Sequence, residues 1–161
     1  MPQGIVDRVA EMAAIAARHG CRLVLENEAG CWGGTGLEAA AIIRQIGPEH
    51  LGLCWDPGNS VRAGSTAPYP DEYDQIKDLV THVHMKNWDP SQTNWQLIER
   101  GLVDWPDLLQ TLQVSGFSGF AVVETHLKTL PDDLEAATDL NGQEASTYRN
   151  LEFVRSCLEL V

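Results

Sequence analysis

Basic side chains and long apolar runs are both scarce in this sequence. There are 11 Lys and Arg against 23 Asp and Glu, which gives a formal net charge of −12. Binding to nucleic acid or to an anionic membrane requires a basic face, so we expect neither partner. No segment approaches the roughly 18 apolar residues that span a bilayer, and the N-terminus lacks the basic-then-apolar pattern of a signal peptide. We therefore expect a cytoplasmic protein with a small-molecule or cation ligand.

Cysteine is also sparse, and its spacing is not that of a metal or disulfide framework. No CxxC pair occurs among the four cysteines, so neither a zinc ribbon nor a set of disulfides is expected. Cys21 and Cys54 lie in or beside apolar segments and are predicted to be buried, reduced thiols. Cys31, in a glycine-rich loop, is the one placed to line a site.

The sequence does contain one repeated unit, an apolar run followed by a polar loop and a helix-forming segment. The apolar runs are continuous, as in strands buried on both faces of a parallel sheet. We predict a single α/β domain over residues 1–161, in which four parallel strands alternate with helices through right-handed crossovers. The expected strands are 21–26, 51–56, 81–86 and 119–124, and the expected helices lie near 4–19, 37–46, 71–79, 105–112 and 143–160.

Each expected strand has, at or near its end, a side chain that can bind a metal ion: Glu26, Asp56, His84 and Glu124. The carboxyl ends of parallel strands meet at one edge of a sheet, so these residues should converge. Three carboxylates and one imidazole form a hard, oxygen-rich set that suits one Mn²⁺, Mg²⁺ or Co²⁺ ion, with Zn²⁺ as a further option. The sequence therefore predicts one divalent-metal site.

Single residues of this set have simpler interpretations. Asp56 before Pro-Gly-Asn is also expected at a helix N-cap or a turn. Glu28 lies just beyond its strand, and we expect its side chain to turn away from Glu26. His82 and His84 share one strand face, so one is expected as ligand and the other as a core or rim residue. The matching positions in four consecutive units favour the shared site.

Aromatic and histidine side chains cluster near the same strand ends. Trp32 is our candidate for a substrate contact, because sugars stack on indoles; loop anchoring is the alternative for it and for Trp88 and Trp95. Trp105 is expected to pack at a helix start. His126, two residues beyond Glu124, is close enough in sequence to reach the rim.

The strings LVLENE, LGLCWDPGNS, HVHMKN and GFSGFAVVE resemble the C-terminal half of the xylose isomerase-like TIM (β/α)₈ barrel proteins, the sugar phosphate isomerase/epimerase superfamily. The resemblance implies that Glu26, Asp56, His84 and Glu124 are metal ligands. His84 is preferred to His82 because it begins the His-Met-Lys triplet. By the same resemblance, Asn59 and Lys86 occupy positions that contact substrate.

The resemblance also implies a metal-dependent sugar (phosphate) isomerase or epimerase. Glu26 and Glu124 would be the catalytic residues, one removing and one returning a proton beside a carbonyl of a polyhydroxy substrate. A hydride shift, a metal-dependent dehydratase or lyase, and a non-catalytic half-barrel remnant are the alternatives. The additional Glu and Arg of the ketose 3-epimerase branch lack good matches here. The endonuclease branch has a histidine where this chain has Asn59, so a nuclease is not expected.

Four units cannot close an eight-stranded barrel, which takes about 250 residues. A half barrel leaves two strand edges and an apolar inner face exposed, which favours association. We therefore expect either a truncated product or a homodimer that completes a barrel-like assembly.

Overall fold

The computed structural model describes residues 2–134 and 139–159. Residues 1, 135–138 and 160–161 of the predicted domain, which include the last residue of the predicted closing helix, lie outside the described residues. None of the described helices is long and apolar enough to cross a membrane. The elements in chain order are α1 (Gln3–Arg18), β1 (Leu23–Glu26), α2 (Gly36–Ile46), β2 (Leu51–Trp55), α3 (Pro57–Arg62), η1 (Pro68–Glu72), α4 (Tyr73–Ile76), β3 (Val80–Met85), β4 (Asn87–Asp89), β5 (Asn94–Gln96), η2 (Ile98–Arg100), α5 (Trp105–Val114), β6 (Phe120–Val123) and α6 (Gly142–Glu159).

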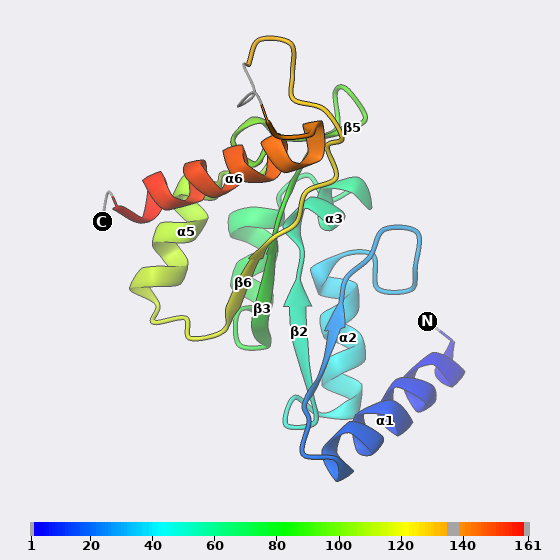
Figure 1. The fold of residues 1–161 in the computed structure, drawn as a ribbon. Coiled ribbons are helices and arrows are strands. Elements are labelled where there is room, and N and C mark those ends of the chain that lie inside the picture. The colour runs from blue at the N-terminus through cyan, green and yellow to red at the C-terminus, as the bar shows by residue number, and fades with distance from the viewer. Residues whose placement is uncertain (1, 135–138, 160–161) are drawn as a thin grey trace.

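One four-stranded sheet of order β1-β2-β3-β6 organises the fold, and all its pairs are parallel (Figure 1). The prediction of an α/β fold with four parallel strands alternating with helices is confirmed. β2 pairs on both sides, and every one of its residues is buried. Its continuous apolar sequence reflects this position, because a central strand meets side chains on both faces.

The core lies between the sheet and the helices, and Figure 1 shows α2 behind β1. α2 starts with a capping box in which the Thr35 hydroxyl accepts from the Glu38 amide and the Glu38 carboxylate accepts from the Thr35 amide. Trp105 is fully buried at the start of α5 and donates its indole N–H to the Lys86 carbonyl, so it packs as predicted. The core is formed mainly by apolar side chains from β2, β3, α2, α4 and α5.

Three local structures differ from the sequence predictions. The segment 57–62, expected as loop, is the short helix α3, because Asp56 caps it and Pro57 suits a first helical turn. The helix expected at 71–79 is instead the π-helical segment η1 followed by the short α4. The long loop after β3 contains the antiparallel hairpin β4–β5.

The end strands of the sheet, β1 and β6, are less protected than the centre. Phe120 and Val122 on β6 are 68% and 47% exposed. His82, the histidine of β3 that was not predicted as a ligand, stacks on Phe120 with ring centroids 5.0 Å apart. It therefore packs against the exposed end strand. Cys54 is buried as expected, whereas Cys21 is exposed because its strand begins only at Leu23.

Candidate metal centre

The four side chains predicted as ligands meet at the carboxyl ends of the parallel strands. Glu26 ends β1, Asp56 follows β2, His84 lies near the end of β3 and Glu124 follows β6. One potential ligand atom from each residue lies within 4.8 Å of the others. The Asp56 side chain is fully buried, whereas the other three are a quarter to about a third exposed. The cluster is therefore accessible from one side.

The Asp56 carboxylate is held by the main chain of α3, and its own backbone is held by Asn27, the residue after β1. Its Oδ1 accepts from the Asn59 amide at 2.8 Å, which is the N-cap contact of α3. Its amide donates to Asn27 Oδ1, and Asn27 Nδ2 donates to the Asp56 carbonyl, both at 2.8 Å. Gly58 packs closely here, since a Cβ at this position would lie 3.1 Å from both the side chain and the carbonyl oxygen of Lys86. The N-cap and ligand interpretations of Asp56 are thus compatible.

A second layer extends from Asp56 into the core. Ser60 Oγ donates to the buried Glu72 carboxylate at 2.6 Å and receives a hydrogen bond from Asn27 Nδ2 at 3.1 Å. Glu72 Oε1 also accepts from the Trp55 indole at 2.9 Å. These bonds join η1, α3 and β2 behind the site, so the position of Asp56 is set by the interior of the fold.

Nδ1 of His84 faces the three carboxylates. It lies 3.0 Å from Glu26 Oε1, 3.2 Å from Glu124 Oε2 and 3.9 Å from Asp56 Oδ2. Hydrogen bonds with Cys54 and with the Glu26 carboxylate raise the pKa of His84 to about 10. Nδ1 is therefore the nitrogen directed at the donor set.

Lys86 contacts two of the three carboxylates. Its Nζ lies 2.8 Å from both Asp56 Oδ2 and Glu124 Oε2, and its side chain is only 4% exposed. Burial opposes the charge on Lys86, but Asp56 and Glu124 outweigh it and raise the Lys86 pKa. Partial burial would raise the pKa of Glu124, yet the Lys86 hydrogen bond and charge lower it below its ordinary value. Lys86 thus balances one of the three negative charges.

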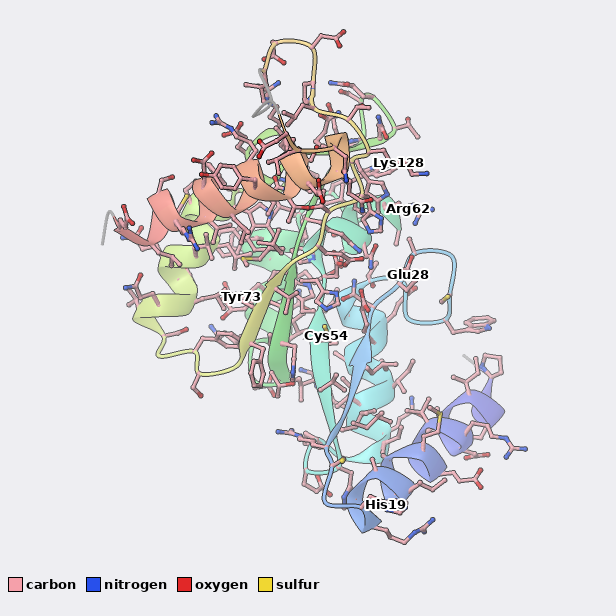
Figure 2. The ribbon with its side chains drawn as sticks, viewed as in Figure 1. His19, Glu28, Cys54, Arg62, Tyr73 and Lys128 are labelled. Atoms are coloured by element: carbon pink, nitrogen blue, oxygen red, sulfur yellow. The ribbon has the colours of Figure 1, made fainter. Side chains whose placement is uncertain are left out.

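Asn59 links Glu26 to Glu28, which was not expected at the site. Its Nδ2 lies 3.4 Å from Glu26 Oε1 and 3.0 Å from Glu28 Oε2. Glu28 also approaches Arg62 at 3.5 Å, and Figure 2 shows these two side chains together near the site end of the sheet. The expectation that Glu28 turns away from Glu26 is wrong. The loop after β1 sets its direction, so strand alternation no longer applies there.

The remaining predicted residues lie at different distances from this cluster. Lys86 and Asn59 contact the ligand set directly. Trp32 lies in the loop between β1 and α2, 62% exposed and outside the contacts described above. His126 reaches the site, with Nε2 2.9 Å from Glu124 Oε1. Its position two residues beyond Glu124 was the only sequence signal for this contact.

The donor set fits a hard divalent cation. Asp56 Oδ2 is buried, and its close contact among the described residues is the Lys86 ammonium at 2.8 Å. Burial raises the pKa of Asp56 to about 7, against the opposing effect of the Lys86 ammonium. A divalent cation would give this buried oxygen a further positive partner, which offsets the cost of burying its charge. Three carboxylates and an imidazole suit Mg²⁺, Mn²⁺ or Co²⁺.

Comparison with known sequences points to one family. The profile of the family described as xylose isomerase-like TIM barrel matches residues 3–157. The uncharacterized protein MJ1311 of Methanocaldococcus jannaschii is 24% identical to the chain over 119 residues, which cover 72% of this chain and 41% of that protein.

Solved structures share the fold at low sequence identity. D-psicose 3-epimerase from Clostridium cellulolyticum H10, solved with D-tagatose, has a TM-score of 0.70 at 16% identity, covering 95% of this chain and 55% of that chain. A xylose isomerase-like TIM barrel protein from Mycobacterium smegmatis, in complex with magnesium, has a TM-score of 0.67 at 23% identity, covering 95% and 49%. The chain spans about half the length of these two proteins, and less than half of MJ1311.

Proposed function

The chain belongs to the xylose isomerase-like TIM barrel family, and from that premise we propose that it is a divalent-metal-dependent isomerase or epimerase of a polyhydroxy carbonyl compound. The observation that carries this proposal is the convergence of Glu26, Asp56, His84 and Glu124 within 4.8 Å. The magnesium and the sugar named for two structures of similar fold support the choice of metal and substrate class. Mn²⁺, Mg²⁺ or Co²⁺ is the proposed cofactor, with Zn²⁺ as the alternative.

The two glutamates are assigned the proton transfers. When bound, the cation would supply Lewis-acid stabilisation of the negative charge that develops on the substrate oxygens. Glu26 and Glu124 come from β1 and β6, the two end strands of the sheet, so they approach the site from different sides. One carboxylate removes the proton beside the carbonyl, and the C–H electron pair enters an enediolate. Return of a proton to the same carbon from the opposite face gives the epimer, and return to the neighbouring carbon gives the isomer.

Three further residues are assigned to substrate binding. Asn59 Oδ1 is buried without a hydrogen-bond partner among the described residues, and a substrate hydroxyl is a suitable donor for it. Lys86 can donate from the floor of the site, where it already contacts Asp56 and Glu124. Trp32 has an exposed indole on which a sugar ring can stack.

The test is a substrate panel in D₂O with Mg²⁺-loaded protein, followed by mass spectrometry of the sugars. The panel contains ketoses, aldoses and their phosphate esters, and Glu26→Gln is the control. Conversion with one deuterium incorporated supports proton transfer through the glutamates. Conversion without deuterium would replace that step by a hydride shift, and loss of water would identify a dehydratase. No conversion of any compound would contradict the proposed activity.

We further propose that a second copy of the chain covers the open sheet. β1 and β6 are the end strands of an all-parallel sheet, so a two-fold axis along the strands would set β6 of one copy beside β1 of the other. Such pairing would cover Phe120 and Val122. Light scattering should then give twice the 17.7 kDa mass of the chain. A monomer at high protein concentration would contradict this arrangement.

A further inference from the structure

His126 lies beside the four-ligand group, two residues beyond Glu124. Its Nε2 is 2.9 Å from Glu124 Oε1 and 3.3 Å from Lys86 Nζ. A lysine ammonium only donates hydrogen bonds, whereas a carboxylate only accepts them. The Lys86 contact has hydrogen-bond geometry, with Nε2 as the acceptor, and the shorter Glu124 contact is at ion-pair distance. His126 therefore contacts both Lys86 and Oε1 of Glu124.

This contact gives the two oxygens of Glu124 different partners. Oε2 lies 2.8 Å from Lys86 Nζ and 3.2 Å from His84 Nδ1, on the side of the other proposed ligands. Oε1 is taken by His126. The carboxylate therefore cannot rotate without breaking a contact at one of its ends. Glu26 differs, because its described contacts with His84 and Asn59 both involve Oε1.

The hairpin β4–β5 backs both side chains that hold Glu124. The Trp95 ring stacks on the His126 imidazole, with centroids 4.7 Å apart and planes at 19°. Lys86 Nζ lies 4.9 Å from the centroid of the same ring. Trp95 pairs across the hairpin with Trp88, and their rings meet edge to face at 5.0 Å. The Trp95 ring thus packs against both His126 and Lys86.

We propose that His126, backed by Trp95, is a positioning residue that keeps Oε2 of Glu124 directed at the metal site. The role rests on the proposed function, which makes Glu124 a metal ligand and proton carrier. Polar side chains that contact a metal ligand from behind fix its orientation, and their loss typically costs about 10–100-fold in metal affinity or activity. Without His126, Oε1 is released and the Glu124 side chain is free to turn.

The test is Mn²⁺ binding followed by electron paramagnetic resonance, which counts free Mn²⁺ and reports the symmetry of the bound ion. His126→Ala should weaken Mn²⁺ binding about 10–100-fold and change the spectrum of the bound ion. His126→Gln retains an N–H donor and should recover most of the affinity. The matched control is His50→Ala, because His50 is exposed and its ion pair is with Glu49. Trp95→Leu removes the ring that packs against His126 and Lys86 but leaves the His126–Glu124 contact in place, and should weaken binding less.

The outcomes separate this role from the proposed function. If the wild type binds Mn²⁺ and His126→Ala matches it in affinity and spectrum, the positioning role is wrong and the metal site stands. A His126→Gln variant no better than His126→Ala would also overturn the role. If the wild type binds no Mn²⁺, the proposed function fails and this role fails with it. Unchanged circular dichroism and melting temperature in the variants exclude a general loss of fold.

Discussion

β2 and β6 are strands of one sheet, and each is followed by a proposed ligand, yet they hold that ligand in different ways. β2 is buried throughout, and Asp56 after it is fixed by main-chain bonds and by Asn27. β6 is a largely exposed end strand; the Glu124 amide after it donates to the Met85 carbonyl, but its carboxylate contacts only side chains among those described above, including Lys86 and His126. The interior of the fold therefore fixes one side of the site, and surrounding side chains fix the other.

The largest expected difference is in stability. Leu53→Ala on β2 should lower the free energy of unfolding by about 2–5 kcal/mol, because the side chain is fully buried. Phe120→Ala on β6 should change it by no more than about 0.5 kcal/mol in dilute protein, as for a surface position. Urea unfolding of both variants measures this. Comparable losses at a concentration where light scattering gives a monomer would show that β6 is covered within a single chain.

The two ligands themselves should show the same contrast. At pH 8 without metal, Asp56→Ala should cost on the order of 2–4 kcal/mol, because it removes the cap of α3 and one of the partners of the buried Lys86. Glu124→Ala should cost less, about 1 kcal/mol, because it removes a partner of the buried Lys86 but no helix cap, and its own side chain is a third exposed. Both variants should lose the metal. Equal stability losses in urea unfolding would contradict the distinction.

Metal affinity should rise with pH. Hydrogen bonds with Cys54 and Glu26 raise the pKa of His84 to about 10, and burial raises the pKa of Asp56 to about 7. A cation must displace the proton from His84 throughout the neutral range, and from Asp56 below about pH 7. The apparent affinity should increase about tenfold per unit between about pH 7 and 9, and more steeply below. Calorimetric titration with Mg²⁺ at several pH values would show this, and an affinity that falls with pH would contradict it.

The smallest effect is expected at Trp32. It belongs to neither of the two ligand environments, so Trp32→Ala should leave the Mg²⁺ affinity within about twofold of wild type. With a converted substrate in hand, the same variant should raise KM and leave kcat unchanged. A loss of metal affinity would place Trp32 in the ligand environment, and an unchanged KM would remove it from the substrate site.

The sheet and the positions of the four proposed ligands could be predicted from sequence because parallel strands impose a simple rule. Apolar runs of similar length each had a Glu, Asp or His at or near the end, and the carboxyl ends of such strands meet at one edge. The sequence also contained the cap signal of α3, Asp56 followed by Pro57, but it was compatible with a turn. A local pattern of this kind does not distinguish an isolated turn from the first turn of a short helix.

The contacts of Glu28, His126 and Trp95 could not be predicted in the same way. Each lies beyond the end of a sheet strand or within the hairpin, where loop conformation sets the side-chain direction. Glu28 contacts Asn59, which belongs to the next strand–helix unit. Trp95 contacts His126, which lies more than thirty residues further along the sequence. Only the folded arrangement brings these pairs together.

The most direct test of the metal centre is the metal content of purified protein after loading with Mn²⁺ or Mg²⁺ and removal of excess ion. Wild type should hold one equivalent per chain, and the double variant His84→Ala with Glu124→Ala should hold none while keeping the wild-type circular dichroism spectrum. A wild type that holds no metal, or a double variant that holds as much, would contradict a shared site built from the four strand ends.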